Sequence, residues 1–300
     1  MKLQHGGLAI LALAVVECGG TTGGNLISIS LQAGGVARDA SQPLSFTTGQ
    51  GWTVRLDQAL VVLGPLYFNV DAPQPSVFRS GVVIMQATEQ FIVDVLNPTL
   101  QDVPGGADGE TGHAVSVEIG FYTTAQSYND TITLSAPLAA GGQQGTAYLA
   151  GEATKGGTVI DFAGRIQITS ALVSGLAPID QISRVAGAVS DLSFTTTSGP
   201  LGLRVNPSHW FDQANFCSLV PASMVGGVAG GTDGGAGDGG SDGGPDTDGA
   251  VDAGASAPAA GPCTPAPGKV YSWTDTNPFN IEVLGGLGGS VGVYQFSLGQ

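Results

Sequence analysis

From Leu26 onward, the chain is a succession of short apolar runs that turn residues separate at intervals of roughly 8 to 15 residues. In one run Trp52, Val54 and Leu56 alternate with polar residues, and this period of two indicates a strand with one buried face. Residues 59–70 are nearly all apolar, as in a strand that is covered on both faces. The pattern predicts an all-β protein, a β-sandwich or jelly-roll-like single domain of about a dozen strands.

The composition supports this prediction. Charged residues make up 11% of the chain, whereas soluble proteins average about 25%. Because exposed helix faces are usually built from Lys, Glu and Arg, the shortage of these residues favours strands and turns. We expect turns at the glycine pairs 105–106, 141–142 and 156–157, and the sequence KGGT at 155–158 predicts a hairpin.

The N-terminal segment has the features of an export signal. One positive side chain, Lys2, precedes an apolar run from Leu8 to Val16. This run is too short for a membrane-spanning helix, which needs about 20 residues, but it matches the apolar core of a secretory signal peptide. We therefore interpret residues 1–17 as a signal peptide and residues 18–25 as a flexible tether.

Cys18 ends this run and is followed by GGTTGG, as in bacterial lipoprotein signals, where the cysteine is lipidated and becomes the mature N-terminus. Glu17 stands where such signals, and ordinary cleavage sites, carry a small residue. We predict that Cys18 is lipidated and that this lipid attaches the protein to the membrane. Simple secretion, an inner anchor and a misassigned start codon stay open. Position 19 is Gly rather than Asp, and by resemblance to such lipoproteins this favours the outer membrane. The domain would then lie in the periplasm or on the cell surface.

Cys217 and Cys263 are the remaining cysteines, and in an exported protein two such residues tend to pair. We predict a disulfide between them, with two free thiols as the alternative. Residues 224–262, between the two cysteines, hold six Asp and no basic residue, and they have too few apolar side chains to offset the entropy of ordering. We therefore predict a disordered insertion within one domain of residues 26–300.

The sequence after the insertion is expected to return to the same domain. The runs KVYSWTDTNPFNIEVL and SVGVYQFSLGQ are strand-like but too short to form a stable domain alone, so we expect them to complete sheets begun earlier. One helical turn is predicted in NPSHWFDQANF, where Pro207 would begin it and Trp210, Phe211 and Phe216 would pack it onto the core.

The net charge excludes some classes of partner. The formal net charge is −15, with nine Lys and Arg residues. Phosphate backbones bind through basic clusters, so we predict no nucleic-acid binding. The acidity fits solubility, or a cationic or calcium partner. The Gly/Asp insertion lacks the regular apolar residues of calcium-binding repeats and the final Glu of an EF-hand, so we expect no cofactor beyond weak calcium association.

Two groups of residues are candidates for chemistry. Asp102, Asp108, Glu110 and His113 stand in one expected loop, where they could bind a divalent metal ion, or form an ordinary solvated turn.

The second group is His209 with its neighbours Trp210 and Asp212, which could form a catalytic or ligand-binding cluster. The alternative is a partly exposed His209 at the start of the helical turn, with Trp210 in the core. No zinc-protease, nucleotide-binding or paired-cysteine motif is present.

Several segments between residues 44 and 216 resemble uncharacterised envelope lipoproteins of Gram-negative bacteria. The segments are FTTGQGWTVRLDQALVVLGPLYF, FIVDVL, GHAVSVEIGFYTTA, TAYLAGEATKGGTVIDFAGRI and LRVNPSHWFDQANF. The resemblance implies a β-rich envelope protein and no activity. In that group a His-rich loop often follows the GPLYF-like strand, whereas this chain has NVDAPQPSVF there, without His. The resemblance therefore implies no metal role for this segment.

Together these observations favour a non-enzymatic envelope lipoprotein, a binding or structural module for a surface or periplasmic protein, a polysaccharide or an ion. A periplasmic metal-binding protein that uses residues 102–113 is the alternative. A secreted hydrolase with a site assembled from scattered residues is the second alternative.

Overall fold

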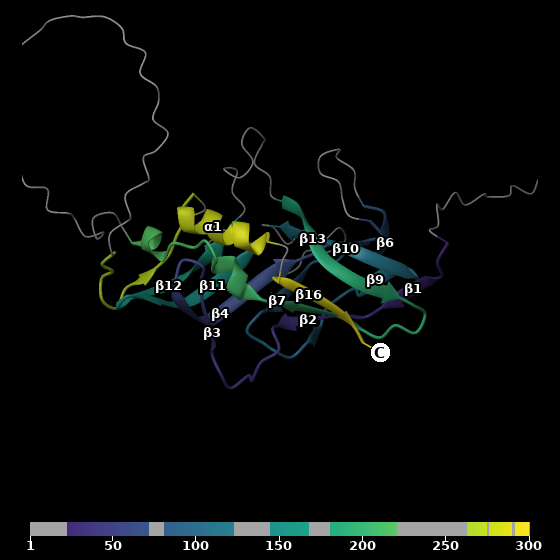
Figure 1. The fold of residues 1–300 in the computed structure, drawn as a ribbon, viewed down its shortest axis with the longest axis horizontal. Helices are drawn as coiled ribbons and strands as arrows, with labels where there is room; N and C mark the ends of the chain where they lie inside the picture. Colours follow the sequence, from purple (N-terminus) through teal and green to yellow (C-terminus); the bar gives the residue numbers. More distant parts are fainter. Residues whose placement is uncertain are drawn as a thin grey trace, which may run out of the picture.

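The computed structural model describes residues 23–71, 81–122, 145–167, 181–220, 263–274, 276–289 and 292–299. Within them the chain forms three β-sheets, one α-helix and two short 3-10 helices, packed in a sandwich-like arrangement (Figure 1). The predicted all-β class is therefore confirmed. The predicted signal peptide, Cys18 and the predicted insertion 224–262 lie outside the described residues.

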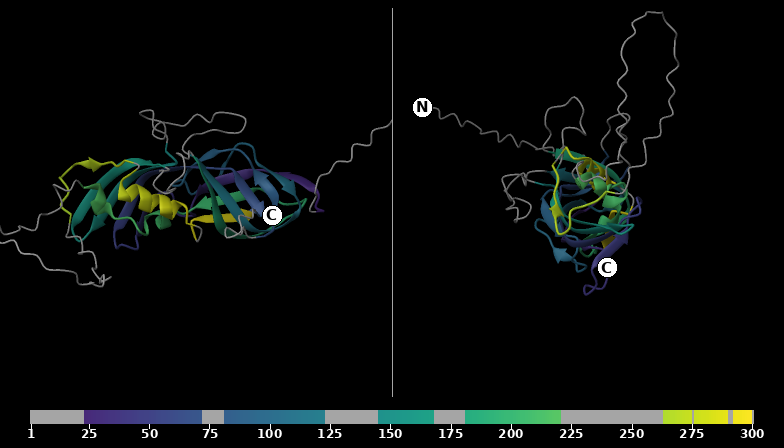
Figure 2. Two further views of the ribbon diagram at one scale, coloured as in Figure 1. Left: turned by 90° about the horizontal axis from the view of Figure 1, so that it is seen from above. Right: turned by 90° about the vertical axis from the view of Figure 1, so that its left-hand side faces the viewer.

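The first sheet forms one end of the elongated molecule (Figures 1 and 2). Its neighbouring strands all run antiparallel. In spatial order they are β1 (Leu26–Ile29), β9 (Ala107–Glu110), β6 (Val83–Ala87), β5 (Leu66–Asn69), β10 (Gly112–Tyr122) and β13 (Gln181–Phe194).

The second sheet lies at the other end, below the helix α1 (Figure 1). Its strands in spatial order are β15 (Val270–Tyr271), β12 (Thr158–Ile166), β11 (Ala147–Lys155), β4 (Thr53–Leu63) and β3 (Leu44–Thr47). A further strand, β7 (Phe91–Asp94), pairs with the second half of β4. The predicted KGGT hairpin is confirmed between β11 and β12, where Gly156 and Gly157 have φ of 56° and 84°.

The third sheet is smaller. Its strands in spatial order are β16 (Tyr294–Leu298), β14 (Leu201–Val205), β2 (Leu31–Gly35) and β8 (Gln101–Asp102). The segment after the insertion therefore does complete earlier sheets, because β15 pairs with β12 and β16 pairs with β14.

The long apolar run 59–70 forms two strands rather than one. Val61, Val62 and Leu63 at the end of β4 are all buried, as are Leu66 and Phe68 in β5. A cis peptide between Gly64 and Pro65 separates the strands and carries the chain from the second sheet to the first. Because both strands are covered on both faces, neither shows the alternating pattern of a half-exposed strand.

The predicted strand in KVYSWTDTNPFNIEVL is largely wrong. Only Val270–Tyr271 is a strand, and α1 occupies Pro278–Leu287. Asn277 caps this helix, since its side chain accepts a hydrogen bond from the Phe279 N–H, and Pro278 occupies the first turn. The pair Asn277–Pro278 was the sequence signal for this start.

The predicted helical turn is confirmed as the 3-10 helix η4 (Pro207–Phe211), and a second 3-10 helix, η5 (Phe216–Leu219), follows it. They pack with α1 on the second sheet, and together they enclose an aromatic cluster. Its rings are those of Trp52, Phe162, Phe211, Phe216, Trp273 and Phe279. Phe162 of β12 lies within this cluster and is fully buried, with its ring centroid 5.2 Å from that of Phe216.

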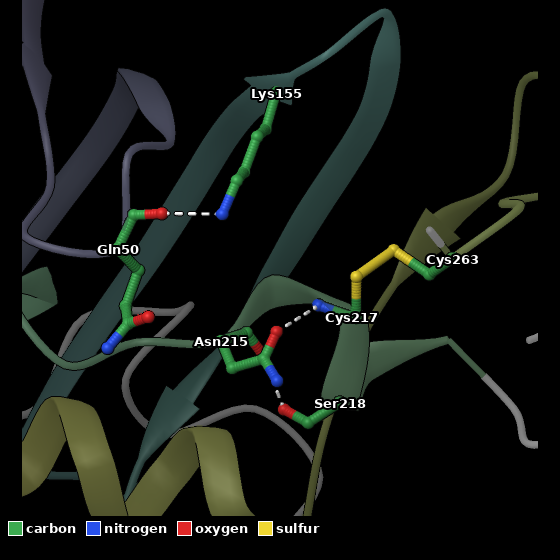
Figure 3. The surroundings of a disulfide bond; sticks show 6 residues. All are labelled: Gln50, Lys155, Asn215, Cys217, Ser218 and Cys263. Atoms are coloured by element: carbon green, nitrogen blue, oxygen red, sulfur yellow. Dashed lines mark hydrogen bonds between the residues drawn. A yellow bond between two sulfur atoms is a disulfide. The ribbon is translucent and has the colours of Figure 1, made fainter. Parts of the chain in front are cut away.

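The predicted disulfide between Cys217 and Cys263 is present (Figure 3). It joins η5 to the segment that carries β15, and Cys263 is buried. Asn215 holds the η5 side of the bond, because its side-chain oxygen accepts a hydrogen bond from the Cys217 N–H at 3.1 Å. Disulfides persist in oxidising compartments, so this bond indicates an exported protein.

The last residues of the expected tether are bound to the domain. The Gly24 N–H donates to Oε2 of Glu110, and the Asn25 N–H donates to Oγ1 of Thr111. These two hydrogen bonds tie residues 24 and 25 to the chain at Glu110 and Thr111. None of the helices in the described ranges is long and apolar enough to span a membrane.

Candidate functional site

The residues of the predicted metal site do not lie in one loop. Asp102 belongs to β8, Asp108 and Glu110 to β9, and His113 to β10. These strands belong to two different sheets, so the prediction of one loop over 102–113 is wrong. The sequence pattern was misleading because strands as short as β8 and β9 can be built largely from Asp, Gly and Gln.

Each of these side chains also has another partner. Asp102 accepts a hydrogen bond from Gln32, Asp108 from Ser28 and Glu110 from the Gly24 N–H. His113 pairs with Asp191 of the neighbouring strand β13.

Among the residues that the structure describes, no three His, Cys, Asp or Glu side chains form a group that could hold a metal ion.

His209 is partly exposed in η4, while Trp210 beside it is fully buried, as the second of the two interpretations expected. Nδ1 of His209 lies 3.0 Å from Oδ2 of Asp212. Together with Glu282 of α1, the two line a shallow hollow against the helix. No serine, threonine or cysteine is among the described residues that line it.

Burial raises the pKa of the Glu282 carboxyl above its ordinary value of 4.5, and a hydrogen bond from the Asn215 N–H partly opposes this shift. A raised pKa in the folded state means that the unfolded chain releases its proton first as the pH rises. The folded protein therefore loses stability as the pH rises from about 4.5 through the folded pKa.

We predict that Glu282→Gln stabilises the protein at neutral pH. The gain is below about 1 kcal/mol, because solvent screens this half-buried group. Unfolding by urea, followed as a function of pH, measures it. The variant and the wild type should be equally stable below about pH 4, where both side chains are neutral, and diverge above it. A variant that is less stable than the wild type at neutral pH would contradict this account.

A second pocket lies where the second and third sheets meet. It has a volume of about 450 Å³, within the range of small-molecule sites. Its walls are the turn before β7 and β7 itself (89–94), β8 and the residues that follow it (101–105), and Ala33 of β2. We call it the β7–β8 pocket.

The wall formed by residues 103–105 is positioned by a glycine turn that the sequence predicted. Gly105 and Gly106 have φ of 82° and 66°, a conformation that favours glycine. A side chain at Gly105 would collide with the side chain of Glu89. The turn therefore brings Glu89, from the opposite wall, directly against the chain that leads from β8 to β9.

Among the described residues that line the β7–β8 pocket, the ionisable ones are all acidic. They are Glu89, Asp94 and Asp102. One oxygen of Asp94 accepts the Leu96 N–H at 2.9 Å, and one oxygen of Asp102 accepts the Gln32 side chain at 2.8 Å. A carboxylate can accept about four hydrogen bonds, so these two side chains retain the capacity to bind a cationic group.

Gln90 is the unusual member of the lining. Its side chain is 2% exposed, yet neither its amide oxygen nor its amide nitrogen has a hydrogen-bond partner among the described residues. Leaving such a buried polar group unsatisfied costs about 1–3 kcal/mol. A buried amide of this kind calls for a partner beyond the described residues, such as an ordered water or a polar ligand.

The sequence did not reveal this pocket. Gln90 stands between Glu89 and Phe91 in a run that reads as an ordinary turn and strand, and burial is not encoded in those residues alone. The signal that was available is a polar residue, Gln90, directly before the apolar run FIV of β7.

Comparisons with known proteins identify no relative from which a function could be transferred. No protein-family model matches the chain, and no curated protein matches its sequence. Among solved structures, MbnP from Methylosinus trichosporium matches with a TM-score of 0.32 and 7% sequence identity, covering 64% of this chain and 79% of that chain.

Proposed function

We propose that this protein is a non-enzymatic, lipid-anchored binding module of the cell envelope, and that its ligand site is the β7–β8 pocket. The observation that carries the proposal is the unpartnered Gln90 amide, buried in the wall of an acidic pocket. The disulfide and the signal-like N-terminus support export.

The charge of the lining specifies the ligand chemistry. The part of the lining that the structure describes has three carboxylates and no basic side chain, so it favours a ligand with an ammonium or guanidinium group. The net charge of −15 adds a long-range attraction for cationic partners. A polar amide in the ligand would provide the hydrogen bonds that Gln90 lacks.

Nα-acetyl-lysine methylamide, which carries one ammonium and two amide groups, is a suitable probe. Titrated into the isotope-labelled full chain, it should shift the backbone amide NMR signals of residues 89–94 and 101–105. The double variant Asp94→Asn/Asp102→Asn should weaken binding at least about tenfold, as expected when a charge-assisted hydrogen bond of about 1.5–3 kcal/mol is lost.

Asp57→Asn/Asp191→Asn is the matched control. It removes the same two charges from exposed positions away from the pocket, so binding should stay unchanged. Equal weakening in both variants, or shifts spread evenly over the molecule, would show that only the net charge attracts the probe. The proposed site would then be wrong.

A further inference from the structure

The β7–β8 pocket is bordered by the free edges of two strands. On one side β7 pairs with β4, and no strand among the described residues pairs with its other edge. On the opposite side β8 pairs with β2 and ends the third sheet. Unpaired strand edges present backbone N–H and C=O groups that can bind an additional strand.

The hydrogen-bond pattern shows which groups of β7 are at the free edge. The Val95 N–H donates to the Ala59 carbonyl. In this antiparallel pairing every second residue bonds to the partner strand, so the backbone groups of Val95, Val93 and Phe91 are the ones that hydrogen-bond to β4. Ile92 lies between them, opposite Val62, whose own N–H donates away from β7 to Thr146. The N–H and C=O of Ile92 therefore point away from β4, and Ile92 lines the pocket.

The same reasoning applies to β8. The Val103 N–H donates to the Leu31 carbonyl, so Asp102, one residue earlier, lies at a position that does not bond to β2. Its backbone groups point outward from the third sheet. Asp102 also lines the pocket and contributes a carboxylate to it.

These edges and the acidic lining suit one class of partner. We infer that the β7–β8 pocket binds an extended peptide segment of a partner protein, with the peptide backbone paired to the edge at Ile92 and a Lys or Arg side chain held by Asp94 and Asp102. In an extended peptide alternate side chains point to the same face, so one cationic residue can enter the pocket while its backbone remains on the edge. Its backbone amides also supply the kind of partner that Gln90 lacks.

This inference rests on the proposed function, since it specifies the ligand of the same pocket. β7 is only four residues long, and Ile92 is the one residue at its centre that offers both groups to a partner. We therefore expect weak binding, with a dissociation constant in the micromolar range or higher, as is typical of transient peptide recognition.

The test compares three short capped peptides by fluorescence anisotropy on the full chain. The first alternates lysine and valine, the second has the same residues with alternate backbone nitrogens methylated, and the third alternates glutamate and valine. Backbone methylation removes the N–H groups needed for strand pairing but keeps the charge. We expect the first peptide to bind at least about tenfold more tightly than either of the others, which corresponds to about 1.4 kcal/mol.

A variant of the edge itself provides an independent readout. Ile92→Pro removes an N–H that points away from β4, so it should weaken binding of the lysine–valine peptide about tenfold. Ile92→Val, which keeps the N–H, should bind as the wild type does. The unfolding midpoint of each variant confirms that it is folded, and if Ile92→Pro is not folded, the methylated peptide alone decides.

The possible outcomes separate the two proposals. If the methylated peptide binds as tightly as its parent while Asp94→Asn/Asp102→Asn still abolishes binding, strand pairing is wrong and the acidic pocket stands. The same conclusion follows if only the single lysine derivative binds. If neither that probe nor any peptide binds, both the pocket and the peptide are wrong.

Discussion

Breaking the disulfide between Cys217 and Cys263 is expected to lower the free energy of unfolding by about 4 kcal/mol. The two cysteines are 46 residues apart in the sequence. The bond therefore removes a large loop-closure entropy from the unfolded chain, and this entropy grows with the length of the loop. The bond also fixes Cys263 in the core, next to the segment that supplies β15 and leads to α1.

Urea unfolding of the full chain, with and without reductant, measures this effect. The double variant Cys217→Ala/Cys263→Ala is the control, since it should start at the lower stability and show no further response to reductant. A loss below about 1 kcal/mol on reduction would contradict the account. Such a small loss would mean that β15 and α1 hold the segment after Cys263 in place without the disulfide.

The second large effect is expected for Phe162→Ala, which should destabilise the protein by about 3–5 kcal/mol. The Phe162 side chain is fully buried, and its ring lies within 6.4 Å of the ring centroids of Phe211, Phe216, Trp273 and Phe279. These four residues come from η4, η5, α1 and the segment between β15 and α1. Removing the ring therefore leaves a cavity between the second sheet and everything packed on it.

Val159→Ala is the matched control on the same strand. Val159 is 45% exposed, so its truncation should change the free energy of unfolding by less than about 0.5 kcal/mol. Denaturant unfolding of both variants gives the comparison. A cost for Phe162→Ala near that of the control would show that the cluster can rearrange to fill the space, and that α1 is not held by these rings.

The two effects concern the same end of the molecule. The disulfide joins η5 to the segment that begins at Cys263, and the aromatic cluster holds η5 and α1 against β12. The β7–β8 pocket lies elsewhere, at the junction of the second and third sheets. Variants of the cluster or the disulfide that remain folded should therefore bind the lysine probe normally.

Local sequence patterns determined much of this fold. Strand periodicity around Trp52, Val54 and Leu56 predicted β4, the glycines of KGGT predicted the hairpin of β11 and β12, and Pro207 predicted η4. Two cysteines in an exported chain also sufficed to predict their pairing. In each case the cause is local, since side-chain spacing and backbone preference act within a few residues.

Local patterns failed where neighbours in space decide the outcome. Residues 278–287 are apolar enough for a strand, and the packing of Phe279 and Val283 on the aromatic cluster favours a helix with its cap at Asn277. Asp102 and Asp108 are only six positions apart, yet the turn at Gly105–Gly106 sends them to different sheets.

The candidate site is the clearest case. The sequence by itself determined that the chain is acidic, β-rich and joined by a disulfide across a Gly/Asp segment. It did not determine that Gln90 would be buried with no partner among the described residues, or that β7 and β8 would border one pocket with edges that no described strand covers. Both features depend on how the second and third sheets meet. That arrangement is set by contacts between residues far apart in the sequence, which no local pattern encodes.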